Sequence, residues 1–116
     1  MTAPDERRWH YRVEYPERAM PVVDTRDGPA RMLDVSEAGL RYELPIGAPP
    51  PEADEEFTAV LRFHDARKVE VRVVITRVSG RRVSARIAAP GIPLNVMFAE
   101  QRWLMRHYPL RFRAAG

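Results

Sequence analysis

The chain has 116 residues, the usual length of one domain, and its hydrophobic fraction of 45% and charged fraction of 30% are ordinary for a globular protein. It has no cysteine, which excludes disulfides, thiolate nucleophiles and cysteine-based zinc sites and suits a cytoplasmic location. A net charge of +3 is too small to require nucleic acid as a partner, and no apolar run is long enough for insertion into a membrane.

Residues 1–12 are polar and rich in arginine, and we interpret them as a flexible arm. After the arm, apolar and polar side chains alternate in segments bounded by turn residues, which predicts half-buried antiparallel strands. The connection Pro45–Glu56 is rich in proline and acidic residues and is expected to be extended and solvated. About six short strands in one chain favour a small barrel or sandwich. The predicted strands are Ala19–Asp24, Ala30–Val35, Leu40–Leu44, Phe57–Phe63, Val69–Val78 and Val83–Ala89.

The end of the chain lacks strand alternation, and Asn95–His107 is predicted to be an α-helix packed on the sheet. Asn95 can cap this helix, and Glu100 lies in the first turns, where a negative charge favours the helix dipole. Pro109 ends the helix, and residues 110–116 form a short basic tail. The predicted apolar stripe of the helix contains Phe98, Trp103, Leu104 and Met105.

Two groups of residues have the chemistry of a binding site. The first is an arginine cluster in which Arg7 and Arg8 precede Arg12, with the form Arg-x-x-x-Arg from Arg8 to Arg12. Each guanidinium offers forked donors that match phosphate oxygens and the O6 and N7 atoms of guanine. Taken alone, the cluster is more often a solvated basic arm.

The second group is Asp34-x-Ser36-x-x-Gly39, at the junction of two predicted strands. Asp34 and Ser36 are two residues apart and can point to one face, where a carboxylate can accept the N1–H and N2–H₂ donors of guanine. Gly39 would permit a positive φ or the close approach of a ligand. Taken alone, the group is more often a tight turn whose side chains bond to the backbone.

Together, and in this order, the two motifs resemble the signature of the PilZ domain family. The resemblance implies a mainly β fold, namely a small six-stranded antiparallel β-barrel with a C-terminal α-helix, spanning residues 13–109. It also implies that cyclic di-GMP is the ligand, with Arg8 and Arg12 on its phosphates and guanine edges and Asp34 and Ser36 on a guanine. In this family the residue before the first motif arginine influences whether one or two ligands bind; Arg7 in that place favours two intercalated molecules.

The chain departs from the family pattern at some outer positions. Ala38 stands where many members have a second glycine, and Arg77 is only a weak candidate for an additional base contact. His10, His64 and His107 have no metal-ligand spacing, so we expect no metal site, and His64 is expected in a solvated hairpin turn.

The leading hypothesis is a non-catalytic receptor for cyclic di-GMP. Binding would order the N-terminal arm and alter contacts with an unidentified effector protein, as in control of motility, pili, exopolysaccharide or virulence. One alternative is an interaction protein of the same fold that binds no nucleotide. Another is a small basic barrel for single-stranded nucleic acid, although the strand aromatics Phe57 and Phe63 fall on the predicted core face. No acid–base or nucleophile constellation is visible, so we expect no enzyme and no catalytic residue.

Overall fold

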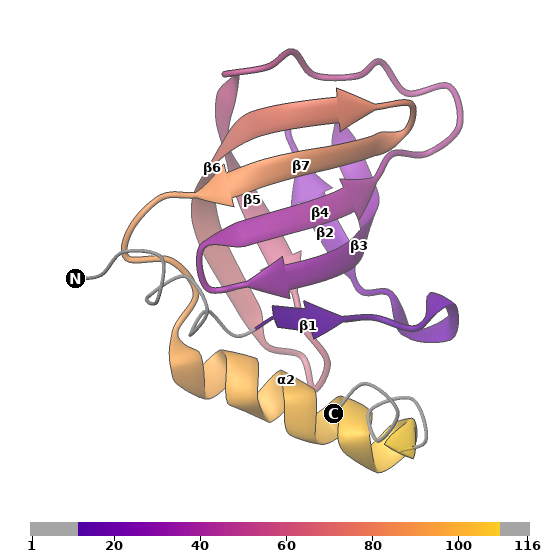
Figure 1. Cartoon of the computed structure of the whole chain (residues 1–116), viewed down its shortest axis with the longest axis vertical. Coiled ribbons are helices and arrows are strands. Elements are labelled where there is room, and N and C mark those ends of the chain that lie inside the picture. Colours follow the sequence, from indigo (N-terminus) through magenta and orange to yellow (C-terminus); the bar gives the residue numbers. More distant parts are fainter. Residues whose placement is uncertain (1–11, 110–116) are drawn as a thin grey trace, which may run out of the picture.

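The computed structural model describes residues 12–109, which form a β-barrel with one α-helix packed against one end (Figure 1). Every strand pairing in this part of the chain is antiparallel. The elements in chain order are β1 (Arg12–Glu14), the 3₁₀-helix η1 (Glu17–Ala19), β2 (Val22–Thr25), β3 (Gly28–Ser36), β4 (Gly39–Glu43), β5 (Glu56–Arg62), β6 (Lys68–Ser79), β7 (Arg82–Ile87) and α2 (Leu94–His107).

The barrel closes through β3, which has three strand neighbours. Within residues 12–109 the ring runs β3, β2, β5, β6, β7 and β4, and β4 pairs with β3 again. The nine residues of β3 allow this, because one edge is shared between β2 and β1 while the other edge pairs with β4. A closed ring leaves no long unpaired edge. The predicted six-stranded antiparallel barrel with a C-terminal helix is confirmed, and β1 is a short additional strand beside it.

The predicted strands correspond to β2–β7, with differences at their ends. The largest difference is at Ala19–Asp24, where Glu17–Ala19 is a 3₁₀-helix and the strand begins only at Val22. Pro21 lies just before it, and a proline cannot donate a backbone hydrogen bond to a strand neighbour. The short strand β1 was not predicted, because three residues are too few to show a period of two.

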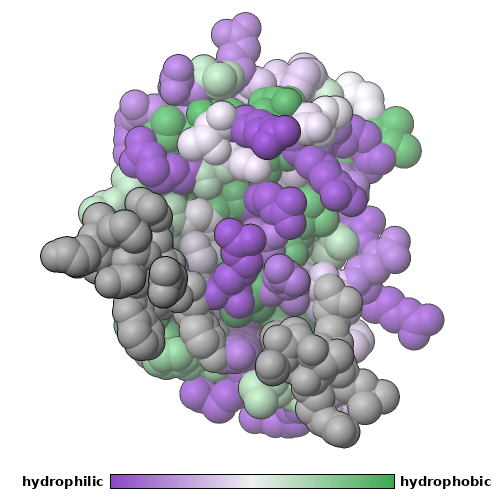
Figure 2. All heavy atoms as spheres, viewed as in Figure 1, coloured by the Kyte–Doolittle hydropathy of each residue, from purple (hydrophilic) through white to green (hydrophobic). Residues whose placement is uncertain are grey.

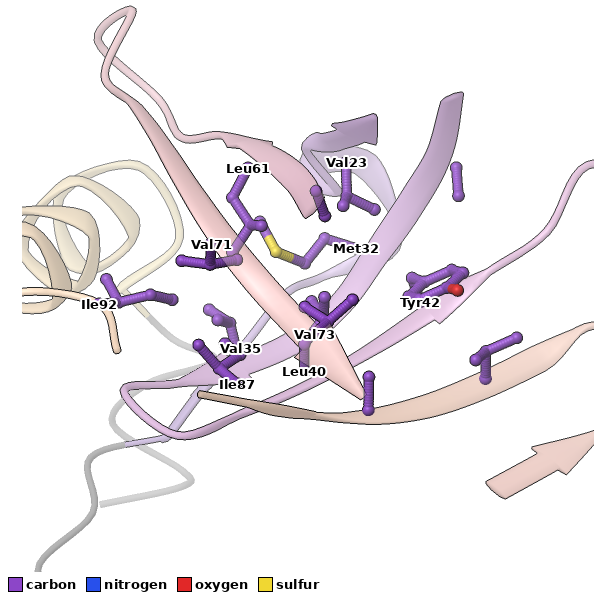
Figure 3. Packing of buried hydrophobic residues seen from close by; sticks show 14 of the residues in the cluster. Val23, Met32, Val35, Leu40, Tyr42, Leu61, Val71, Val73, Ile87 and Ile92 are labelled. Atoms are coloured by element: carbon purple, nitrogen blue, oxygen red, sulfur yellow. The ribbon is translucent and has the colours of Figure 1, made fainter. Parts of the chain in front are cut away.

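Alternating side chains of the strands fill the barrel. Val73 and Ile75 of β6 are fully buried, and so are Met32 of β3 and Leu61 of β5, so that the apolar faces of neighbouring strands meet inside (Figure 3). Burying a side chain of this size contributes about 1.5–3 kcal/mol. The aromatic side chains of β4 and β5, Tyr42 and Phe57, are also inside, and so is Phe63, which directly follows β5. The core position of Phe57 and Phe63 was predicted.

Helix α2 lies where it was predicted but buries a different face. It starts at Leu94 after Pro93, and no side chain caps it, so the predicted role of Asn95 as a cap is wrong. The fixed φ of a proline suits the entry to a helix without such a cap. Phe98 is 42% exposed and Met105 is 49% exposed, so neither belongs to the buried stripe. The buried positions are Met97, Ala99, Glu100 and Leu104, with Trp103 partly buried against the core.

Glu100 anchors the helix to the barrel rather than facing the helix dipole. Its side chain is fully buried. One carboxylate oxygen accepts a hydrogen bond from the Tyr15 hydroxyl at 2.7 Å and lies 2.6 Å from Nδ1 of His64, while the other accepts from the His64 backbone N–H at 3.1 Å. The imidazole of His64 stacks on Trp103, with ring centroids 3.7 Å apart. The expected solvated position of His64 is therefore wrong.

Candidate ligand-binding site

A β-bulge in β3 determines which way Asp34 points. Met32 pairs with Tyr42 and Asp34 pairs with Arg41, so two steps along β3 match one step along β4 and Leu33 is an extra residue. Met32 is buried in the core, and in a regular strand Asp34 would face the core as well. A bulge re-aims the side chains that follow it. The extra residue thus turns Asp34 to the outer wall of the barrel.

The register of β1 and β3 confirms this orientation and gathers the motif residues. Val35 pairs with Val13, and both are fully buried, so their neighbours along the strands face outwards. Arg12 pairs with Ser36 in the same register and is exposed. The structure therefore brings Arg12, Asp34 and Ser36 together on one outer wall, whereas the predicted ligand contacts Arg7 and Arg8 lie outside the described residues.

Asp34 is held by Arg41 of the neighbouring strand. Nε of Arg41 donates a hydrogen bond to Oδ2 of Asp34 at 2.6 Å, and Nη2 of Arg41 lies at the same distance from that oxygen. The Asp34 side chain is 6% exposed and that of Arg41 is 47% exposed. Hydrogen bonding to the carboxylate, together with its charge, raises the pKa of Arg41. The hydrogen bond of this pair is charge-assisted.

A polar hollow opens beside this ion pair. Its volume is about 190 Å³, and it is lined by Glu14, Tyr15, Leu33, Asp34, Arg41 and Arg82. Figure 2 shows hydrophilic side chains gathered over this wall, in the same view as Figure 1. The lining combines carboxylates with guanidinium groups, which suits a ligand that has both hydrogen-bond donors and negative charge.

The turn between β3 and β4 is fixed from the side of the helix. The backbone N–H of Ile92 donates to the carbonyl of Glu37 at 3.1 Å, and Ser36 Oγ accepts from the N–H of Ala38 at 3.4 Å. Gly91 has φ of +78°, and a Cβ on it would lie 2.2 Å from the carbonyl oxygen of Glu37. The segment before α2 can approach the turn only because this residue is glycine.

Gly39 does not use the positive φ that a glycine permits. It is not among the described residues with positive φ, and an added Cβ would be 3.5 Å from Ser36 Oγ, an ordinary contact. The backbone of β4 therefore accepts a side chain here.

Two arginines of β7 reach the site and were missed by the sequence analysis. Arg82 lines the hollow, and Arg86 pairs with Gly39 at the motif turn. Both are exposed, and neither has an ion pair or side-chain hydrogen bond within residues 12–109. Arg77, the sequence candidate, lies farther away on β6, opposite Ser84. The alternation of side chains in β7 predicts that Arg82 and Arg86 lie on the outer face of the barrel. Only the pairing of β7 with β4 places them beside the motif residues.

Among the described residues, no group of three or more His, Asp or Glu side chains could hold a metal ion. Residues 12–109 likewise include no helix long and apolar enough to cross a membrane.

The fold and the hollow define a small closed β-barrel with a polar hollow on one outer wall. The sequence model of the PilZ domain family matches residues 6–103, and the chain belongs to this family. No curated protein matches the sequence.

Solved structures share the fold at low sequence identity. The PilZ domain of YcgR from Escherichia coli, solved with cyclic di-GMP, is 17% identical with a TM-score of 0.64, covering 94% of this chain and 98% of that one. The inhibitor of motility MotI from Bacillus subtilis is 15% identical with a TM-score of 0.62, covering 87% of this chain. This chain spans 50% of the length of MotI. An uncharacterized protein of Legionella is 10% identical with a TM-score of 0.54, covering 92% of this chain and 100% of that one.

Proposed function

We propose that this protein is a non-catalytic receptor for cyclic di-GMP. The observation that carries the proposal is the outward turn of Asp34 at the β3 bulge, beside Ser36 and Arg12, in a chain of the PilZ family. The related YcgR domain was solved with cyclic di-GMP. This ligand has two phosphate charges and two guanines, and arginine serves both. Arg8 and Arg12 would grip the phosphates and guanine edges, and Asp34 and Ser36 would bond to a guanine.

Burial of the strand aromatics favours this proposal over binding of single-stranded nucleic acid. Such binding uses exposed rings on strands as stacking platforms. Tyr42, Phe57 and Phe63 are at most 8% exposed and face the core of the barrel. The strands described here therefore offer bases no aromatic surface.

Calorimetric titration with cyclic di-GMP tests the proposal, with GTP as a specificity control. Wild type should show saturable binding, and Arg12→Ala and Asp34→Ala should each weaken it by at least about tenfold. The matched control is Arg62→Ala, which removes an exposed guanidinium of β5, paired with Asp24, on another part of the barrel. If folded wild type binds no cyclic di-GMP, the protein is an interaction module of the same fold instead.

We propose further that two intercalated ligand molecules bind, with Arg7 stacked between bases. The same titration then gives two ligands per chain for wild type and one for Arg7→Ala. A stoichiometry of one for wild type would exclude this part of the proposal.

The signal would leave through ordering of the N-terminal arm and altered contacts with an effector protein. Limited digestion with trypsin, which cleaves after arginine, tests the first step. Ligand should protect the bonds after Arg7 and Arg8 in wild type but not in Asp34→Ala. Equal cleavage with and without bound ligand would rule out a signal that depends on ordering of the N-terminal arm.

A further inference from the structure

The two oxygens of Asp34 have different surroundings. Nε of Arg41 donates to Oδ2 and Nη2 lies 2.6 Å from the same oxygen, whereas no donor within residues 12–109 reaches Oδ1. No fully buried side-chain oxygen in this part of the chain lacks a partner. The hollow that Asp34 and Arg41 line opens beside this carboxylate. Arg41 thus occupies Oδ2, while Oδ1, here termed the free oxygen, has no donor within residues 12–109.

The free oxygen suits guanine more than adenine. A carboxylate oxygen has two lone pairs and can accept the N1–H and N2–H₂ donors on the Watson–Crick edge of guanine. Adenine presents an unprotonated N1 on the same edge, and this acceptor repels a carboxylate. Asp34 can therefore discriminate guanine from adenine only if its carboxylate oxygen points at the Watson–Crick edge of the base.

Arg41 is placed to fix that orientation. It forms the only ion pair that Asp34 has within residues 12–109, and it is the Cα partner of Asp34 across β3 and β4. On the other edge of β3, Glu14 is the Cα partner of Asp34, and its charge would repel an unpaired Asp34. Arg41 offsets this repulsion as well, because it interacts with both carboxylates.

We propose that Arg41 is a positioning residue that directs the free oxygen of Asp34 into the hollow and so sets the preference for guanine over adenine. The inference rests on the proposed function, because it concerns the same ligand site. The family motifs that identified Asp34 do not include Arg41, which stands two residues after Gly39. The opposite arrangement would be a latch, in which Arg41 blocks Asp34 until the ligand displaces it.

A double-mutant cycle separates these roles. Calorimetry with cyclic di-GMP is performed on wild type, Arg41→Gln, Asp34→Asn and the double variant. Arg41→Gln should weaken binding by about tenfold, the worth of one charge-assisted hydrogen bond. The double variant should bind no more weakly than Asp34→Asn alone, because Arg41 acts through Asp34. Additive losses, or tighter binding by Arg41→Gln, would overturn the proposal.

Base discrimination gives a second readout that a general loss of charge would not change. Cyclic di-AMP has the same phosphates, and its affinity should be equal in wild type and Arg41→Gln. Arg82→Gln is the matched control, since it removes from the same hollow a guanidinium that has no ion pair within residues 12–109. It should weaken both ligands alike. Equal weakening of both ligands by Arg41→Gln would reduce Arg41 to a phosphate contact and contradict the inference.

Thermal melting guards against misfolding. Arg41→Lys keeps the positive charge without the planar fork, so it should melt like wild type yet still lose part of the guanine preference. Full guanine preference in a folded Arg41→Lys would contradict positioning by the fork. Absence of cyclic di-GMP binding by wild type would instead contradict the proposed function, so the two failures are distinguishable.

Discussion

Glu100 has the most buried charged side chain within residues 12–109, and its partners show how one residue ties a helix to a barrel. Its carboxylate is bonded to Tyr15, after β1, and to His64, in the connection between β5 and β6. Burial, together with the charge of Glu100, raises the pKa of Tyr15. A buried carboxylate is tolerated when such donors satisfy it.

Removing the Tyr15 hydroxyl should destabilise the protein by about 1.5–3 kcal/mol, the usual worth of a hydrogen bond to a charged group. The variant Tyr15→Phe tests this by urea denaturation. Tyr108→Phe is the control, because the Tyr108 hydroxyl donates to no other residue in the described part of the chain. Equal midpoints for Tyr15→Phe and wild type would show that the hydroxyl contributes nothing to stability.

Stability should also fall at alkaline pH because of buried tyrosine. Burial raises the pKa of Tyr42 to about 12, from an ordinary value of 10.0. Above pH 10 the unfolded chain loses this proton while the folded chain keeps it, so stability is complete below pH 10 and is lost as the pH rises towards 12. Urea midpoints from about pH 9 to about pH 11.5 should decline less steeply for Tyr42→Phe. If the urea midpoints of Tyr42→Phe fall with pH as steeply as those of wild type, groups other than Tyr42 cause the loss of stability.

At the scale of elements, the approach of the segment before α2 to the β3–β4 turn depends on Gly91. Alanine there meets the Glu37 carbonyl as well as an unfavourable positive φ. Gly80 also has a positive φ, of +61°, but an added Cβ would meet nothing within 4 Å. Comparing alanine at Gly80 with alanine at Gly91 therefore separates the cost of backbone strain from the cost of steric overlap.

We expect Gly80→Ala to cost about 1–2 kcal/mol through strain alone, and Gly91→Ala to cost clearly more. Thermal and urea unfolding of the two variants measure this difference. Gly39→Ala should remain close to wild type in stability, because its Cβ has room. Equal losses at Gly80 and Gly91 would mean that the turn shifts freely.

At the scale of the whole molecule, the barrel closes on itself and α2 covers one end of it (Figure 1). Leu104 is fully buried under the helix, while the next residue, Met105, is 49% exposed. Adjacent side chains of one helix thus have opposite surroundings. We therefore expect the packing of α2 on the barrel to depend on Leu104 and not on Met105.

Leu104→Ala should lower the free energy of unfolding by about 2–5 kcal/mol, the cost of a cavity in a packed core. Met105→Ala should change it by less than about 0.5 kcal/mol. Chemical denaturation of both variants provides the comparison. A small effect at Leu104 would mean that the helix is dispensable for the stability of the barrel.

The alternation of β4–β7 was readable because the two faces of a strand differ within a few residues of sequence. Phe57, Leu61 and Val73 were therefore assigned correctly to the core. The helix faces were less readable, since Phe98 and Met105 are as apolar as the residues that are buried. Glu100 could not be recognised as buried, because its partners Tyr15 and His64 are distant in sequence.

By itself the sequence determined the barrel with its C-terminal helix and the motif residues Arg12, Asp34, Ser36 and Gly39, because alternation and motif spacing are local properties of the chain. Only the tertiary structure decided that the β3 bulge turns Asp34 outwards, that Arg41 holds one of its oxygens and that Arg82 lines the same hollow. These features depend on which strands become neighbours and in what register, and a one-residue change of register exchanges the two faces of a strand.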